Sequence, residues 1–177
     1  MKTTTKFKEK FLFLILCSVL CVIALVLIFL YLQGYRINLT ESLPYRILKI
    51  KDASDKPISR WDYVVADYSL MEDNPAIKLA LERKYLGRFP MAKQVAAISG
   101  DSVFLRDNRL YVNGEDLGSM TVLSADSLGN PLYPFPTPVT LQSGQYWLIS
   151  NPKRGFDSRY FGWIERKSIT HIAYPVF

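Results

Sequence analysis

The sequence is poor in the residues from which metal centres, disulfides and thiol nucleophiles are built. Only two cysteines and one histidine occur in its 177 residues. Both cysteines, Cys17 and Cys21, lie in an apolar run near the N-terminus, so the remainder offers neither a disulfide nor a thiol nucleophile. A transition-metal site normally needs several histidine, cysteine or carboxylate ligands close together, and the sequence shows no such group. We therefore expect neither a metal nor any other cofactor.

Charge and glycine patterns argue against two further classes of protein. The formal net charge is +6, but like charges do not gather in blocks of five or six, the pattern typical of a nucleic-acid-binding segment. A glycine-rich loop of the kind that cradles phosphates is also absent from the sequence. We expect no nucleic acid among the partners.

One long stretch has no charge of either sign. Residues 11–32 contain no charged side chain, and their length of about 22 residues matches one crossing of a bilayer. A cleaved signal peptide has a shorter apolar core and a small-residue cleavage site, which residues 31–36 do not provide. Four lysines precede the stretch, and positive residues stay in the cytoplasm. We expect a cytoplasmic N-terminus (1–10), a transmembrane signal-anchor helix (11–33) and an exported domain (34–177).

The exported part is dominated by strand patterns. Segments rich in β-branched and aromatic residues predict seven or so strands, with hairpin turns at Asp107-Asn108 and Asn113-Gly114; the clearest strands are 45–50, 61–68, 91–99, 101–106, 145–150 and 168–177. One short helix is predicted from Asn74, ending at Gly87. The proline-rich residues 128–138 and the aromatic-rich residues 151–164 are expected to be irregular. The fold class is therefore mainly β, an antiparallel domain with one short helix.

Elimination leaves a serine with a lysine base as the most economical hydrolytic pair. A Ser-His-Asp triad would depend on His171, in the closing strand, and a lone histidine is more often structural. A lysine can act as a base only if burial lowers its pKa towards neutrality. Lys93 fits this need, because the alternate positions of its strand are Met91, Val95 and Ala97. The alternative, an edge-strand lysine that prevents strand pairing, remains equally open at this point.

Ser42 is a candidate nucleophile by its position. It follows the apolar stretch closely, and Pro44 restrains the backbone just beyond it. Thr40 shares a face with Ser42 in an extended segment, so its hydroxyl and the Ser42 N–H can serve as two oxyanion donors. The alternative is an ordinary turn, since serine and threonine before a proline are common turn residues.

Three segments resemble the signature boxes of the type I signal peptidases, the serine-lysine S26 family. They occur in the family's order: "NLTESLP" from Asn38, "MAKQVAAISGDSV" from Met91 and "GFDSRYFG" from Gly155. The first is most similar to the conjugative-transfer TraF-type branch, which favours Asn-x-Thr-x-Ser-x-Pro. The resemblance covers nearly all of the chain after residue 33. It implies a mostly antiparallel β domain beside the membrane, in agreement with the strand patterns.

The resemblance also implies roles for particular residues. Ser42 is the nucleophile, Lys93 the general base, and Thr40 with the Ser42 N–H the oxyanion site. Asp157 and Arg159 organise the loop behind this dyad. The substrate is expected to bind as an extended strand, with shallow apolar pockets for small residues. By their proximity to the expected dyad in the sequence, Ile37, Leu39 and Met91 are the candidates to line these pockets.

Four positions depart from the family pattern. Gly155 stands where many members have a serine that orients the lysine, so another group must hold Lys93. Trp61 and Arg46 stand where glycine is usual, and Trp163 where proline is common. These departures indicate a divergent member.

The resulting hypothesis is a membrane-anchored serine endopeptidase of the bacterial inner membrane, with its catalytic domain in the periplasm. It would remove leader or propeptide segments from exported precursors, in particular pilin in conjugative transfer, and its partners would be the precursor polypeptide and the lipid bilayer. One alternative is a general signal peptidase I for secreted precursors. Another is a non-catalytic anchored subunit of a secretion or pilus assembly, which docks through its proline-rich, aromatic surface.

Overall fold

The computed structural model describes residues 2–39, 43–71, 73–86, 89–126, 128–150 and 155–177, with the backbone alone for residues 2–9. The chain divides into two compact units, Met1–Arg36 and Ile37–Phe177. The expected nucleophile Ser42 and the oxyanion residue Thr40 lie outside the described residues.

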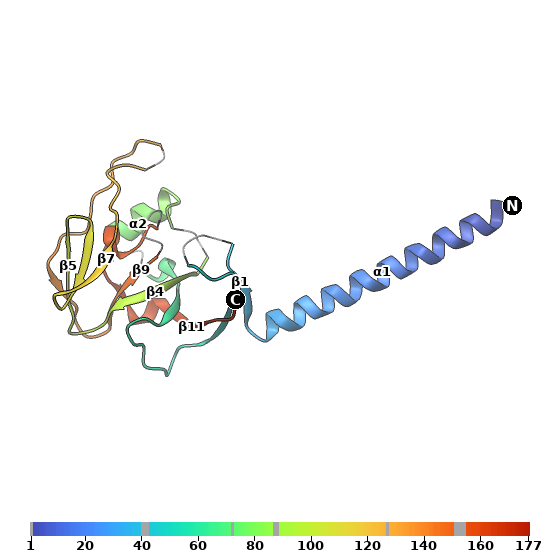
Figure 1. Cartoon of the computed structure of the whole chain (residues 1–177), viewed down its shortest axis with the longest axis horizontal. Helices are drawn as coiled ribbons and strands as arrows, with labels where there is room; N and C mark the ends of the chain where they lie inside the picture. Colours follow the sequence, from blue (N-terminus) through green and yellow to red (C-terminus); the bar gives the residue numbers. More distant parts are fainter. Residues whose placement is uncertain (1, 40–42, 72, 87–88, 127, 151–154) are drawn as a thin grey trace. The chain divides into compact units, whose positions relative to one another are not determined.

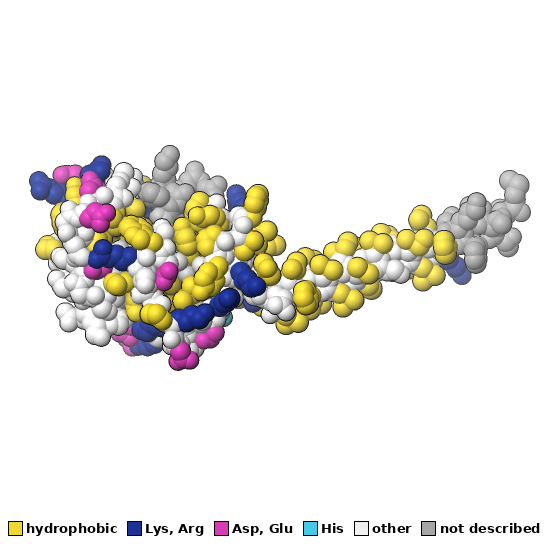
Figure 2. Space-filling view, turned by 60° about the horizontal axis from the view of Figure 1, so that its bottom comes forward, with side chains coloured by type: hydrophobic (Ala, Val, Ile, Leu, Met, Phe, Trp, Pro, Cys, Tyr) yellow, Lys and Arg dark blue, Asp and Glu magenta, His cyan; other side chains and the backbone are white. Residues whose placement is uncertain are grey.

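The first unit is a single long helix, α1 (Lys2–Leu32). Its residues 10–32 are long and apolar enough to cross a membrane, and hydrophobic side chains lie along its visible surface (Figure 2). The hydroxyl of Ser18 donates to the carbonyl oxygen of Leu14 at 2.9 Å, so this polar group is satisfied within the helix. Gly34, with φ of +88°, follows the helix in a conformation that suits glycine. The short strand β1 (Tyr35–Ile37) lies where the two units divide.

The second unit is built from two antiparallel sheets, as the strand patterns predict (Figure 1). In the larger sheet, the strands of this unit follow the order β2 (Ile47–Asp52), β11 (Ile169–Pro175), β3 (Tyr63–Ala66), β4 (Met91–Ala97), β9 (Gln145–Ile149) and β10 (Ile164–Glu165). The smaller sheet has the order β7 (Glu115–Ser119), β6 (Arg109–Val112), β5 (Ser102–Arg106) and β8 (Val139–Thr140). The helical elements are α2 (Pro75–Glu82), α3 (Ser158–Phe161) and the 3₁₀ turns η1 (Tyr68–Met71) and η2 (Arg166–Ser168). The prediction of a mainly antiparallel β domain is confirmed.

The turns and the start of α2 lie where the sequence predicts them, but the end of α2 does not. Both predicted hairpin turns form, with positive φ at their central residues. Helix α2 begins after its cap Asn74 as expected but ends at Glu82, so its predicted extension to Gly87 is wrong. The reason is that the chain turns away at Lys84, with φ of +60°, and buries Leu86 in the core. Helix α3 was not predicted; the carboxylate of its cap residue Asp157 accepts the Arg159 N–H.

Side chains from both sheets and from the helices form the core. The largest buried cluster joins α2, α3 and the larger sheet through residues such as Ile77, Val95, Leu148 and Phe161. A second cluster joins the two sheets around the fully buried Trp147. Each large side chain of this kind stabilises the fold by roughly 1.5–3 kcal/mol. The result is a firmly held larger sheet, which carries Lys93 in β4.

Candidate active site

Lys93 lies in the interior of the larger sheet. Its strand β4 runs between β3 and β9, with Lys93 opposite Val64 of β3. The side chain is 1% exposed, and Val95, on the same face of the strand, belongs to the largest buried cluster. The edge-strand alternative therefore does not hold, and the inward orientation that the alternating pattern predicted is observed.

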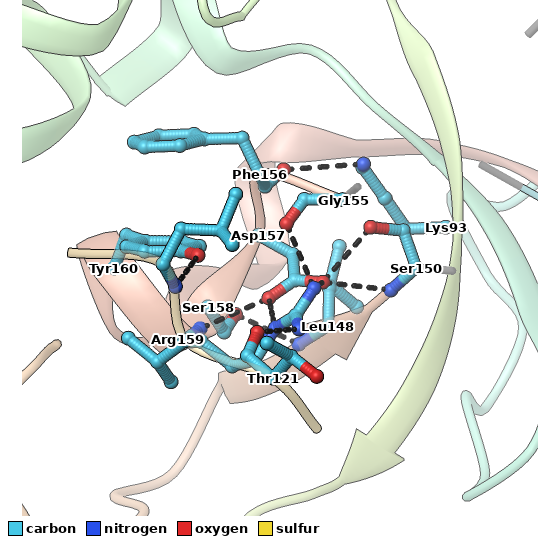
Figure 3. Close-up of polar contacts among 12 residues, drawn as sticks. Lys93, Thr121, Leu148, Ser150, Gly155, Phe156, Asp157, Ser158, Arg159 and Tyr160 are labelled. Carbon is cyan, nitrogen blue, oxygen red and sulfur yellow. Dashed lines mark hydrogen bonds and ion pairs between the residues drawn. The ribbon is translucent and has the colours of Figure 1, made fainter. Parts of the chain in front are cut away.

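A backbone carbonyl holds the ammonium group of Lys93. Its Nζ donates to the carbonyl oxygen of Phe156 at 3.2 Å (Figure 3). Gly155 stands where many family members have a serine that orients the lysine. In this chain the Phe156 carbonyl oxygen is the group that contacts Lys93 instead. Because a carbonyl oxygen only accepts, it can bind the lysine in both its protonated and its neutral form.

Burial lowers the pKa of Lys93 to about 8, because desolvation penalises the charged ammonium group. The nearby carboxylate of Asp157 acts in the opposite direction and raises this pKa, whereas the guanidinium of Arg159 lowers it. A lysine of this kind is partly neutral near physiological pH and can accept a proton.

The same burial makes Lys93 costly for stability. The lowering of its pKa from 10.5 to about 8 corresponds to about 3 kcal/mol, since each tenfold change in proton affinity is worth about 1.4 kcal/mol. Lys93→Met replaces the lysine by an unbranched, uncharged side chain that is one atom shorter. We expect this variant to raise the free energy of unfolding by about 2 kcal/mol at neutral pH, after the loss of the hydrogen bond to Phe156. Urea unfolding of the full-length chain in detergent micelles measures this difference.

The pH dependence gives the control for this variant. Between pH 8 and 10.5 the unfolded chain retains a lysine proton that the folded chain has lost, so wild-type stability rises with pH in this window. The advantage of Lys93→Met must therefore shrink above pH 8. Lys78→Met on the exposed surface of α2 should show no such dependence. A Lys93→Met variant less stable than wild type at every pH would contradict the burial cost.

A buried ion pair lies behind the lysine. Asp157 and Arg159 are both 0% exposed, and the Arg159 Nε donates to the Asp157 Oδ1 at 2.7 Å. The other carboxylate oxygen accepts from the Arg159 Nη2 and from both the N–H and the hydroxyl of Ser150, at 2.8–2.9 Å. The guanidinium also donates to the carbonyl oxygens of Thr121 and Gly155, each at 2.7 Å (Figure 3). These hydrogen bonds hold the third box around the carbonyl that binds Lys93.

Two contributors to this network were not predicted from the sequence. Ser150, the residue after β9, donates two hydrogen bonds to Asp157. Ser158, at the start of α3, accepts the Leu148 N–H at 2.9 Å and so ties the helix to β9. Their hydroxyls resemble those of many other serines in the sequence, and only their positions in the fold distinguish them.

The residues that follow Ser42 are anchored on the sheet that carries Lys93. Leu43 is 6% exposed and packs in a third cluster with Leu48, Val65 and Ala173. Ala92, the neighbour of Lys93 in β4, packs against the same cluster. The chain next to the expected nucleophile is therefore fixed to the strand of the expected base.

The other candidate residues have different degrees of exposure. Ile37 and Leu39 are 72% and 85% exposed, so their side chains are accessible to a bound polypeptide. Met91 is partly buried against the largest cluster. The ring of His171 lies 2.9 Å from the hydroxyl of Thr170, its neighbour in β11. Among the described residues, no cluster of histidine, cysteine, aspartate or glutamate is suited to hold a metal ion.

Comparison with known proteins identifies the family of this chain. The family model for signal peptidase, peptidase S26, matches residues 9–176. The chain belongs to the signal peptidase S26 family. It is 32% identical over 151 residues to the conjugal transfer protein TraF of Agrobacterium fabrum. The matched region covers 81% of this chain and 82% of that protein. It is 31% identical over 158 residues to a plasmid transfer protein TraF of Escherichia coli, with coverage of 82% and 84%.

The chain is also similar to a protein of known structure. The signal peptidase I of Enterococcus faecalis is 22% identical and superposes with a TM-score of 0.42 over 67% of this chain and 98% of its own. Membership of the S26 signal peptidase family makes this chain a peptidase whose substrate is a polypeptide. Together with the apolar helix, it indicates a membrane-anchored protein.

Proposed function

We propose that this S26 peptidase is a serine endopeptidase that cleaves exported precursors with a dyad of Ser42 and Lys93. The observation that carries the proposal is the buried Lys93, with a pKa lowered to about 8, on the sheet to which Leu43 is anchored. At pH 7 about a tenth of such lysines are neutral. This is a sufficient population for general base catalysis.

The reaction follows from the chemistry of these groups. Neutral Lys93 takes the proton of the Ser42 hydroxyl while the Ser42 oxygen attacks the scissile carbonyl. The Thr40 hydroxyl and the Ser42 N–H stabilise the oxyanion that forms. Protonated Lys93 then gives its proton to the leaving amine. Water, activated in the same way, releases the acyl group. Phe156 holds Lys93 throughout, because its carbonyl oxygen accepts from either protonation state.

The substrate is proposed to bind as an extended strand between the segment before Ser42 and β4. Ile37, Leu39 and Met91 would line shallow pockets for small residues. Ile37 and Leu39 are exposed enough for this role. Asp157 and Arg159 contribute indirectly, by fixing the loop that supplies the Phe156 carbonyl.

The proposed setting is the bacterial inner membrane. Residues 1–10 would be cytoplasmic, 11–33 would span the lipid bilayer and 34–177 would lie in the periplasm, since positive residues precede the apolar span. The TraF relatives are named for conjugal and plasmid transfer, which favours pilin maturation over general processing of secreted precursors. General signal peptidase I activity is the second candidate and uses the same chemistry.

The test is cleavage of a precursor with a small-x-small site by full-length protein in detergent micelles. Wild type should cleave, Ser42→Ala should not, and Ser119→Ala, an exposed serine of β7, should cleave normally. A pilin precursor and a secretory precursor, compared side by side, distinguish the two candidate processes. A wild type that cleaves neither, and is not labelled at Ser42 by an acylating probe, would favour a non-catalytic anchored subunit.

A further inference from the structure

Two hydrogen bonds join Asn38, which precedes Ser42 in the sequence, to residues that follow Ser42. The backbone N–H of Asn38 donates to the carbonyl oxygen of Arg46 at 2.8 Å. Its side-chain Nδ2 donates to the carbonyl oxygen of Tyr45 at 2.9 Å. Because a carbonyl oxygen only accepts, the NH₂ group of the amide must face Tyr45. The second contact therefore requires a donor that an aspartate at this position does not have.

Tyr45, which accepts this side-chain hydrogen bond, packs against the sheet that carries Lys93. Tyr45 packs edge-to-face on Tyr63 of β3, with ring centroids 5.4 Å apart. Tyr63 in turn pairs with Gln94, the neighbour of Lys93 in β4. The Asn38 amide thus links the chain before Ser42 to the strands that position the base.

We propose that Asn38 is a positioning residue, whose amide sets the separation between the chain that precedes Ser42 and the chain that follows it. This inference rests on the proposed function. Thr40 and Ser42 are two and four residues beyond Asn38. The amide contact fixes the distance between Asn38 and Tyr45, which flank these residues in the sequence. Catalysis is sensitive to such positions, since a displacement of about 1 Å can cost about 100-fold in rate.

The amide contact can be removed without removing the fold. The backbone hydrogen bond to Arg46 persists whatever side chain occupies position 38. The contact with Tyr45 is only partly buried, so water can satisfy the freed carbonyl. A second anchor also remains, because the N–H groups of Arg46 and Ile47 both donate to the Phe177 carbonyl oxygen at 2.7 Å. Stability and catalysis should therefore respond differently to substitution.

The experiment compares full-length wild type, Asn38→Asp and Asn38→Ala in detergent micelles. Asn108→Asp is the matched control: it makes the same chemical change at an exposed turn between β5 and β6, where the side-chain oxygen accepts the Val122 N–H at 3.1 Å and a carboxylate can still do so. Four quantities are measured: kcat and KM for a precursor peptide, the rate of labelling of Ser42 by a β-lactam acylating probe, the kinetic pKa of the base, and the thermal unfolding temperature.

We expect both Asn38 variants to lose about 10- to 100-fold in kcat and a similar factor in labelling rate. KM, the kinetic pKa and the unfolding temperature should stay close to wild type, as should every property of Asn108→Asp. Wild-type kcat in the Asn38 variants would overturn the inference, as would a loss matched by a loss of folded protein. If wild type cleaves the peptide and Ser42→Ala cleaves it equally well, the proposed function fails, and this inference with it.

Discussion

Precursor cleavage by the wild-type protein is expected to rise with pH through a kinetic pKa of about 8 and to be lost when Lys93 is replaced. Burial lowers the pKa of this lysine to about 8, and in the proposed mechanism only its neutral form can take the proton of the Ser42 hydroxyl. Lys93→Ala removes the proposed base. Lys93→Arg keeps a cation that does not deprotonate. Both variants should lose at least about 10⁴-fold in kcat, as when one member of a serine peptidase's catalytic unit is removed.

The measurement is kcat and kcat/KM for one precursor peptide from about pH 6 to pH 10. The pH dependence of kcat/KM reports the pKa of the base in the free enzyme. Lys78→Ala, on the exposed surface of α2, is the matched control and should follow the wild-type profile. Full activity in Lys93→Ala would refute the dyad. If His171→Ala were inactive at the same time, the catalytic base would be the histidine of a triad.

Breaking the buried ion pair should have the largest effect on stability. Asp157→Asn preserves the shape of the side chain but leaves the guanidinium of Arg159 buried without its counter-charge. It also places an NH₂ group among donors from Ser150 and Arg159. Losing one partner of a fully buried pair typically costs about 3–5 kcal/mol. We expect a loss of this size in the free energy of unfolding, measured with urea on the full-length chain.

The same variant should alter the base electrostatically. The Asp157 carboxylate raises the pKa of Lys93, so its removal should move the kinetic pKa below 8 in whatever protein remains folded. The control is Asp116→Asn, which breaks an exposed pair with Arg109 and should leave stability almost unchanged. An Asp157→Asn variant as stable as wild type, or one with a raised kinetic pKa, would contradict this account.

The strand alternation around Lys93 indicated an inward position but left an edge-strand lysine equally open. Met91 and Val95 pack on the same cluster, as the period of two predicts. Ala97 does not, because a bulge between Val95 and Ala97 places it in the second cluster. The turns at Asp107 and Asn113 were predictable, because few residue types tolerate positive φ. The end of α2 was not, since burial of Leu86 overrode the local helical pattern.

The sequence by itself determined the apolar helix, the mainly β class and the order of the three boxes. All of these follow from residue identity and short-range periodicity. Only the tertiary structure decided that the Phe156 carbonyl, 63 residues further along the chain, would hold Lys93. It also decided that Ser150 would join the Asp157 pair and that Asn38 would reach Tyr45. Contacts of this kind depend on which strands are neighbours and on where loops return to the sheet, and neither is encoded in a local pattern.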